Sequence, residues 1–223
     1  VDYEQWNTDK NLFLPKAYDK NDLSGKFACK TFLKSKFKFP SKNLPLYGTI
    51  SRLAHQKGID ILVESLQQIL CDNLAHIIIL GSGDECLANQ LNLLENKFPD
   101  SMRFVEGYDN GLAHLIEAGS DFYIMPSRFE PCGLNQLYSL RYGTPPIVHA
   151  VGGLNDSVKD LSEKGATGIK FSEPTPNQLL EAINSSLSLY RHQKDLDALR
   201  ITGMTQDFSW QNSLIEYYRL YHT

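Results

Sequence analysis

Short apolar runs alternate along this chain with amphipathic stretches of helical length. The runs are continuously apolar, as expected for strands that are covered on both faces of a sheet. Because helices separate consecutive strands, the connections are right-handed crossovers and the strands are parallel. The pattern predicts an α/β fold, a single Rossmann-like domain over residues 1–223 with a parallel sheet and helices on both faces. The predicted strands are 46–50, 75–80, 102–105, 121–125 and 146–148, and the predicted helices are 26–36, 59–70, 85–97, 112–118, 133–142, 178–190, 196–204 and 210–221, with a short helix that opens at 152.

Composition and charge argue against several classes of partner. The net charge of −4 disfavours a nucleic-acid surface, which would carry a basic stripe. The four cysteines form no C-x-x-C pair, so they indicate free thiols in a reducing cytoplasm and not a zinc site or a disulfide frame. No apolar run approaches the ~20 residues of a membrane span, and no signal peptide is evident. We therefore expect a soluble cytoplasmic protein with no membrane or nucleic-acid partner and no bound metal.

The two ends of the chain differ from its regular centre. Residues 1–25 show little periodicity and are predicted to be linker-like. The chain starts at Val1, without a methionine, so we expect a fragment of a longer protein. Residues 210–223 are predicted to form a terminal helix with an apolar stripe at three- and four-residue steps, which would mark an interface if exposed. The stripe consists of Trp210, Leu214, Tyr217, Tyr218 and Tyr221.

The stretch from Pro126 to Tyr138, P-S-R-F-E-P-C-G-L-N-Q-L-Y, places a carboxylate beside the start of a helix. Glu130 lies on the loop that follows a predicted strand, at the sheet edge where ligands bind in α/β folds. We predict that the backbone amides after Pro131 form an anion socket, and that the cysteine of the loop contacts the ligand. This pairing suits a ligand with both a phosphate and a centre of developing positive charge. The socket and contact residues are Cys132, Gly133, Leu134 and Asn135.

Two cations follow the first predicted strand. Arg52 and Lys57 bracket a loop at the same sheet edge, and Lys57 stands at a helix start, where a cation opposes the helix dipole. A diphosphate would relieve that opposition, because Arg can bind it through two nitrogens while Lys acts as a point charge. The alternative, two solvated surface charges, is the commoner situation for such residues.

Tyr108 follows the third predicted strand at the same edge. Its ring could stack on a flat base, or it could equally pack on the neighbouring helix. The nearby Gly81-Ser82-Gly83 is not G-x-G-x-x-G, and we interpret it as a turn.

These motifs resemble those of bacterial glycogen synthases and plant starch synthases. The resemblance spans nearly the whole chain but only the carboxyl-terminal half of that family's length. It implies the carboxyl-terminal lobe of a GT-B glycosyltransferase, which transfers glucose from ADP-glucose to the non-reducing 4-hydroxyl end of an α-1,4-glucan with retained configuration. It also implies that Arg52 and Lys57 contact the donor diphosphate without a metal, Tyr108 lies beside the adenine, and Glu130 lies near the reacting carbon.

Two features limit the mechanism that the resemblance implies. Tyr138 stands where wider retaining families carry a second Glu, which agrees with glycogen and starch synthases and disfavours a mechanism with paired carboxylates. The K-x-G-G-L loop of the other lobe is absent, and residues 151–154, V-G-G-L, lack its Lys. We therefore expect the chain alone to bind ADP without extending a glucan, and its terminal helix to reach the other lobe. The alternatives are a UDP- or sucrose-type glucosyltransferase lobe, and a non-catalytic nucleotide-binding module, for which Glu130 would have no use.

Overall fold

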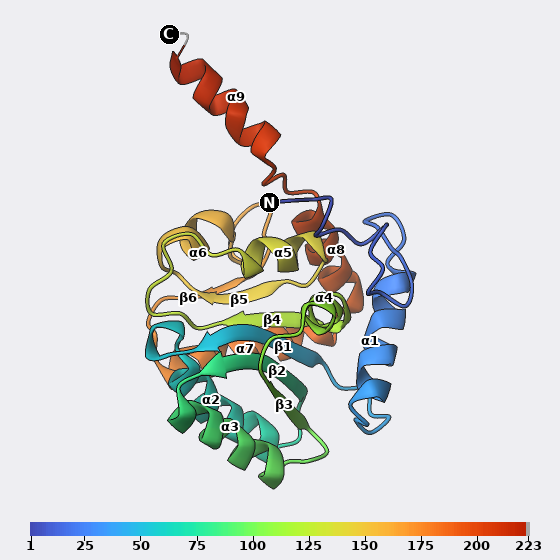
Figure 1. Cartoon of the computed structure of the whole chain (residues 1–223), viewed down its shortest axis with the longest axis vertical. Coiled ribbons are helices and arrows are strands. Elements are labelled where there is room, and N and C mark those ends of the chain that lie inside the picture. Colours follow the sequence, from blue (N-terminus) through green and yellow to red (C-terminus); the bar gives the residue numbers. More distant parts are fainter. Residues whose placement is uncertain (222–223) are drawn as a thin grey trace.

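The computed structural model describes residues 1–221, except the side chains of residues 213, 215–217, 219 and 220. Its centre is a six-stranded parallel sheet with the order β3-β2-β1-β4-β5-β6 (Figure 1). The elements are α1 (Ser24–Lys36), β1 (Leu46–Leu53), η1 (His55–Lys57), α2 (Ile59–Cys71), β2 (His76–Gly83), α3 (Glu85–Lys97), β3 (Met102–Glu106), α4 (Asn110–Gly119), β4 (Phe122–Met125), α5 (Asn135–Arg141), β5 (Pro146–His149), α6 (Gly152–Ser157), β6 (Ile169–Phe171), α7 (Pro176–Tyr190), α8 (Gln193–Met204) and α9 (Trp210–Tyr221).

The strand order places a topological switch point between β1 and β4. The chain builds the sheet outward through β2 and β3, then returns to the other side of β1 with β4. Both strands run parallel, and Tyr47 of β1 lies opposite Phe122 of β4. Crossovers that leave in opposite directions open a crevice at the carboxyl ends of these two strands, where ligands bind in doubly wound sheets.

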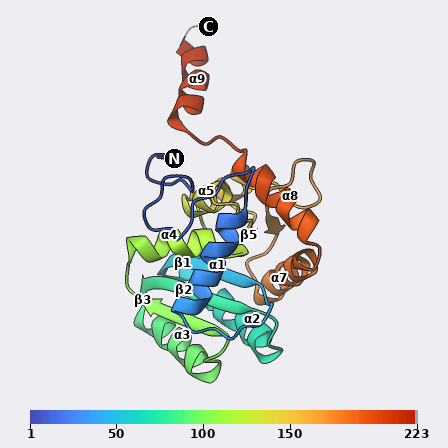
Figure 2. The ribbon, with the colours of Figure 1, turned by 90° about the vertical axis from the view of Figure 1, so that its right-hand side faces the viewer.

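The continuous apolar run of β2 supplies two cores at once. Ile77 and Ile79 belong to the core that also holds residues of α2, α3 and α7, whereas Ile78 and Leu80 belong to the core beneath α1 and α4. Successive side chains of a strand point to opposite faces, so a strand buried on both faces must be apolar throughout. The predicted α/β fold, with helices on both faces of a parallel sheet, is confirmed (Figure 2).

Two local features were not predicted from the sequence. The strand β6 has only three residues, too few to leave a periodic signal. The inward face of α1 includes Lys26 beside Cys29 and Leu33, while Phe27 and Phe32 are exposed. Lys26 is tolerated inside because its ammonium group donates three hydrogen bonds, to the carbonyl oxygens of Ala118 and Tyr142 and to the Thr144 hydroxyl.

The amino-terminal segment is irregular but lies on the domain. Residues 1–18 contain no helix or strand. The amino group of Val1 nevertheless donates to the carbonyl of Phe208, and Trp6 stacks on Tyr138 with a 3.8 Å centroid separation. The segment that was predicted to be linker-like therefore packs against the rest of the domain.

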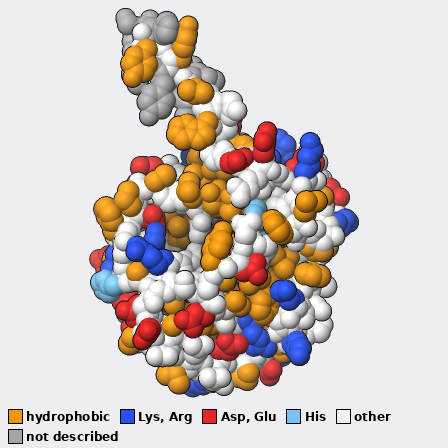
Figure 3. Space-filling view, in the orientation of Figure 1, with side chains coloured by type: hydrophobic (Ala, Val, Ile, Leu, Met, Phe, Trp, Pro, Cys, Tyr) orange, Lys and Arg blue, Asp and Glu red, His pale blue; other side chains and the backbone are white. Residues whose placement is uncertain are grey.

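The last helix, α9, projects from the body of the domain (Figures 1 and 3). Four residues of the predicted apolar stripe are between 59% and 83% exposed, namely Trp210, Leu214, Tyr218 and Tyr221. The side chain of the fifth, Tyr217, lies outside the described residues. None of the helices that the structure describes is long and apolar enough to cross a membrane.

Candidate functional site

A cavity of about 170 Å³ opens at the carboxyl ends of β1 and β4, at the switch point. The strand β1 and the loop after β4 supply most of its walls. It brings together six of the residues predicted from the sequence, namely Arg52, Lys57, Glu130, Gly133, Leu134 and Asn135.

An ion pair between Lys57 and Glu130 lies at the centre of this cavity. The Lys57 Nζ is 2.5 Å from Oε2 of Glu130, and the Ser127 hydroxyl donates to the same oxygen at 3.3 Å. The side chain of Glu130 is only 8% exposed and that of Lys57 is 22% exposed. Burying a carboxylate this deeply costs free energy unless a cation is paired with it, and Lys57 is that cation.

A second ion pair holds the Glu130 loop against α2. Arg128 binds Asp60 through two hydrogen bonds of 2.6 and 2.7 Å and also donates to the carbonyl of His55. The hydrogen bonds from Arg128 lower the pKa of the Asp60 carboxyl. Gln56 adds two further contacts. Its side-chain amide donates to the backbone carbonyl of Phe129, and its backbone carbonyl accepts from the backbone amide of Arg128. These contacts place Lys57 of η1 and Glu130 side by side.

The start of α5 is held in place by hydrogen bonds of its first two side chains. The Asn135 amide donates to the carbonyl of Ile50 at 2.7 Å and to the hydroxyl of Tyr123 at 2.9 Å. Gln136 turns back and donates to the carbonyls of Cys132 and Gly133. None of the described side chains caps α5 at its amino end, so the first backbone amides of the helix keep their capacity to bind an anion.

The glycine pair at the start of α6 packs directly on the Glu130 loop. The Gly153 amide donates to the carbonyl of Glu130 at 3.0 Å. A Cβ at Gly153 would lie 2.0 Å from the carbonyl oxygen of Cys132, and one at Gly152 would lie 2.3 Å from that of Glu130. No role was predicted for this V-G-G-L segment, and its two adjacent glycines are the signal that could have suggested a close backbone approach.

Three predicted residues lie at the rim of the cavity or beyond it. Arg52 is exposed, and its guanidinium donates to the side chain of Gln56 at 3.2 Å. Tyr108 is 77% exposed, does not line the cavity and bonds to the Asn110 side chain. Cys132 is also exposed outside the cavity, with its thiol directed at the neighbouring Gly133 carbonyl.

Tyr138 stacks on an aromatic ring of the amino-terminal segment. Its ring is parallel to that of Trp6, which also stacks on His114 at 4.0 Å. Burial raises the pKa of the Tyr138 hydroxyl. The residue therefore serves packing between α5 and the amino-terminal segment, a role that its position in the motif did not predict.

The described residues contain no group of three or more His, Cys, Asp or Glu side chains that could hold a metal ion, and the four cysteines are free thiols. The cavity instead combines a buried carboxylate, two cations and an uncapped helix start. Cations and amides can hold an anionic leaving group, and a carboxylate can stabilise positive charge on the carbon that the group leaves.

The fold and this site agree with one family of known proteins. Residues 31–198 match the family model described as Glycosyl transferases group 1, and the chain belongs to this family. It is similar to a glycogen synthase of Aliivibrio fischeri, with 44% identity over 228 residues that cover 100% of this chain and 47% of the relative. The chain thus spans about half the length of the curated relatives that it matches.

Solved structures agree with this assignment. The catalytic domain of starch synthase IV from Arabidopsis thaliana, bound to ADP and acarbose, has a TM-score of 0.92 and 32% identity, covering 100% of this chain and 47% of that one. A sucrose-phosphate synthase from Thermosynechococcus elongatus, with 22% identity and a TM-score of 0.67, covers 94% of this chain and 51% of that one and shares the fold. The resemblance to glycogen and starch synthases that the motifs indicated is confirmed.

Proposed function

We propose that this chain is the donor-binding, carboxyl-terminal half of a glycogen or starch synthase. The reaction moves glucose from ADP-glucose to the non-reducing 4-hydroxyl end of an α-1,4-glucan and retains the anomeric configuration. The observation that carries the proposal is the buried Lys57–Glu130 pair in a cleft that Arg52 borders. The ADP named with the starch synthase IV structure supports the choice of nucleotide.

The two cations act on the leaving group. As the bond between the sugar C1 and the diphosphate breaks, negative charge accumulates on the departing ADP. Arg52 can bind this charge through two nitrogens, and Lys57 reaches it from inside the cleft. Because Lys57 also forms an ion pair with Glu130, it holds the carboxylate beside the reacting carbon. Preorganised charges of this kind need no reorganisation during the reaction.

Glu130 acts on the sugar. Glycosyl transfer passes through an oxocarbenium-like state, whose positive charge a nearby carboxylate stabilises. Tyr138 is engaged in the stack with Trp6, so the mechanism assigned here uses one carboxylate of this chain. We assign two exposed residues to contacts with the donor that form as the cleft closes. They are Tyr108, which follows β3, and Cys132, on the loop after β4.

The proposal includes the setting of the reaction. Arg52, Lys57 and the amides of Gly133 to Asn135 neutralise the diphosphate, so we expect transfer to continue with a chelator present. The free thiols fit a reducing cytoplasm. The glucan acceptor is assigned to the half of the relatives that this chain does not cover.

The experiment is a transfer assay on the full-length protein. Radiolabelled ADP-glucose and UDP-glucose are offered with glycogen, with and without a chelator, to the wild type and to Glu130→Gln. We expect incorporation from ADP-glucose in α-linkage, insensitivity to the chelator, and a loss of about 10²–10³-fold in kcat for Glu130→Gln. Preferred use of UDP-glucose would assign the chain to the UDP-dependent transferases, and an unaffected Glu130→Gln would remove the carboxylate from the mechanism.

A further inference from the structure

The charged groups of the cleft come from two neighbouring strands whose backbone ladder is short. The strand β1 leads to the two cations, and β4 leads to the carboxylate and to the start of α5. The ladder between these strands pairs Tyr47 with Phe122 and Gly48 with Tyr123. Both pairs lie before the carboxyl ends, where the cleft opens. The relative position of the two halves of the site therefore depends on further contacts.

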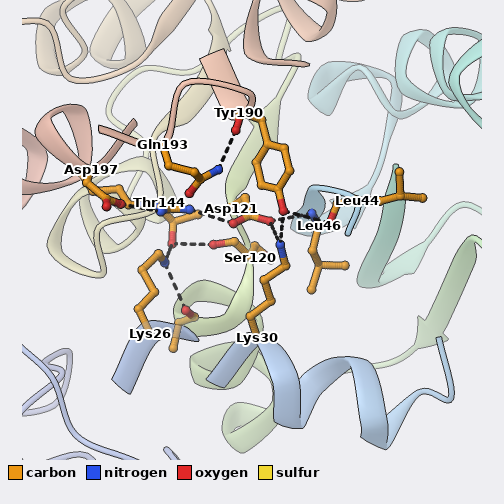
Figure 4. Close-up of polar contacts among 12 residues, drawn as sticks. Lys26, Lys30, Leu44, Leu46, Ser120, Asp121, Thr144, Tyr190, Gln193 and Asp197 are labelled. Atoms are coloured by element: carbon orange, nitrogen blue, oxygen red, sulfur yellow. Dashed lines mark hydrogen bonds and ion pairs between the residues drawn. The ribbon is translucent and has the colours of Figure 1, made fainter. Parts of the chain in front are cut away.

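At the beginning of the two strands, a side chain extends their pairing. Asp121, directly before β4, accepts from the backbone amide of Leu46 at 2.8 Å (Figure 4). The backbone amide of Asp121 in turn donates to the carbonyl of Leu46 at 2.7 Å. Leu46 is the first residue of β1, so these contacts join the strands at the end remote from the cleft.

At the cleft end, the hydroxyl of a buried tyrosine joins β4 to β1. The side chain of Tyr123 is fully buried. Its hydroxyl accepts from the backbone amide of Ile50 at 2.8 Å and donates to the carbonyl of the same residue at 2.9 Å. The hydroxyl thus bonds both backbone polar groups of Ile50, two residues beyond Gly48 in the ladder.

The same hydroxyl reaches the start of α5. The Asn135 amide donates to it at 2.9 Å and to the carbonyl of Ile50 at 2.7 Å, so the three groups form a closed ring of hydrogen bonds. Burial raises the pKa of the Tyr123 hydroxyl well above its ordinary value, so it keeps the proton that it donates. Hydrogen bonds that are linked in this way strengthen and stiffen one another.

Both partners of Tyr123 belong to the cleft. Ile50 lines the cavity and lies two positions before Arg52. Asn135 also lines it and opens α5, where the backbone amides are predicted to bind an anion. A diphosphate must meet the cation and these amides at the same time, so the distance between them has to be set before the ligand arrives.

We infer that Tyr123 is a positioning residue of the cleft, whose hydroxyl holds the end of β1 that carries Arg52 at a fixed distance from the start of α5. Because its side chain is fully buried, Tyr123 acts through Ile50 and Asn135 and not by touching a substrate. The choice of ligand, a nucleoside diphosphate sugar, rests on the proposed function, whereas the hydrogen bonds of Tyr123 do not.

The test compares Tyr123→Phe with a matched variant, Tyr47→Phe. Tyr47 is also almost fully buried, and its hydroxyl lies 2.7 Å from the Ser186 hydroxyl of α7, away from the cleft. Each variant therefore loses one buried hydroxyl and keeps its ring. Circular dichroism and thermal unfolding verify that both variants fold and lose comparable stability.

The first arm is hydrogen–deuterium exchange on the 223-residue chain without any ligand. We expect Tyr123→Phe to raise the exchange rates in residues 50–57 and in residues 132–138 by about fivefold or more, because both segments lose their common anchor. Tyr47→Phe should leave both segments within about twofold of the wild type. Unchanged protection of either segment in Tyr123→Phe, or equal changes in the two variants, would overturn the inference.

The second arm measures transfer from ADP-glucose by the full-length protein. We expect Tyr123→Phe to lower kcat/KM about tenfold and Tyr47→Phe to stay within about twofold of the wild type. In an Arg52→Ala background, Tyr123→Phe should cost only about threefold or less, since its effect passes through the position of Arg52. An unchanged kcat/KM in Tyr123→Phe, or an equal loss in both backgrounds, would overturn the inference.

The two arms separate this role from the function proposed for the cleft. A wild-type protein that does not use ADP-glucose would remove the proposed function. The exchange rates, which need no ligand, would then decide the role of Tyr123 alone.

Discussion

Lys57 and Glu130 are separated by 73 positions in the chain and meet through a 2.5 Å contact inside the cleft. Each was predicted as a site residue from its own strand end, but their pairing depends on how η1 packs against the loop after β4. The pair explains why a carboxylate can be stable beside an anion-binding helix start. Lys57 is therefore assigned two tasks, one toward the carboxylate and one toward the leaving group.

The first residue-scale prediction concerns the two cations. In the full-length enzyme, Arg52→Ala and Lys57→Ala should each raise the barrier to transfer by about 3 kcal/mol while glycogen binding changes little, because preorganised charges act on the leaving group. Steady-state kinetics and a glycogen-binding assay measure the two effects, with Lys164→Ala as the matched exposed control. Turnover within about threefold of the wild type in either variant would exclude a leaving-group role worth over 1 kcal/mol.

A second prediction concerns His76. Both of its ring nitrogens are buried and have no hydrogen-bond partner among the residues that the structure describes. Burial together with neighbouring lysines lowers its pKa from 6.5 to about 4. The unfolded chain therefore binds a proton between these two pH values that the folded chain does not bind. The contribution of neutral His76 to the free energy of unfolding is fully present above pH 6.5 and is lost as the pH is lowered toward 4.

Urea unfolding at about pH 7 and pH 5 measures this effect. The wild type should lose about 1–2 kcal/mol more than His76→Leu between the two pH values, since each pKa unit corresponds to about 1.4 kcal/mol. His192→Gln, on the exposed turn before α8, should behave like the wild type. An equal loss in wild type and His76→Leu would show that other groups cause the pH dependence.

Among the elements, regular periodicity decided what could be predicted from the sequence. Helices such as α2 and α3 and the central strands were located within a few residues, because their apolar patterns are long. The strand β6 is only three residues long, and Lys26 is buried through tertiary hydrogen bonds, so neither leaves a periodic signal. The fold was predictable at the level of class and layers.

The site was predictable in its charged residues but not in its supports. Arg52, Lys57 and Glu130 carry motifs, whereas the clasp of Arg128 on Asp60 joins residues 68 positions apart. Likewise, the stack of Trp6 on Tyr138 depends on an irregular segment that has no periodicity to read. These contacts form between elements, and local pattern carries no information about them.

Gly58 links two elements and gives a prediction at this scale. It adopts φ 67° between η1 and α2, and a Cβ there would lie 2.0 Å from the carbonyl oxygen of Pro126. Gly165 has φ 76° with nothing within 4 Å of a Cβ, so it reports backbone strain alone. Gly58→Ala should therefore destabilise the chain by at least about 1 kcal/mol more than Gly165→Ala, which should cost about 1–2 kcal/mol. Urea unfolding of both variants makes the comparison, and equal losses would mean that the approach of η1 to the β4 loop is not tight.

At the scale of the whole molecule, the chain supplies one side of the proposed active-site cleft. The cations, the carboxylate and the α5 start all lie on this domain and are held by contacts within it. The exposed stripe on α9 and the exposed Tyr108 are surfaces that a second domain could cover. Retaining transfer needs water excluded and both substrates aligned, so we expect this chain alone not to extend glycogen.

We propose above that the switch-point cleft of this chain binds ADP in preference to UDP. Calorimetric titration of the 223-residue chain with ADP and with UDP, repeated on Arg52→Ala, tests it most directly. We expect ADP to bind with a dissociation constant of about 0.1–1 mM, UDP to bind more weakly, and Arg52→Ala to lose most of the ADP affinity. Equal or tighter binding of UDP, or ADP binding that Arg52→Ala leaves unchanged, would contradict the claim.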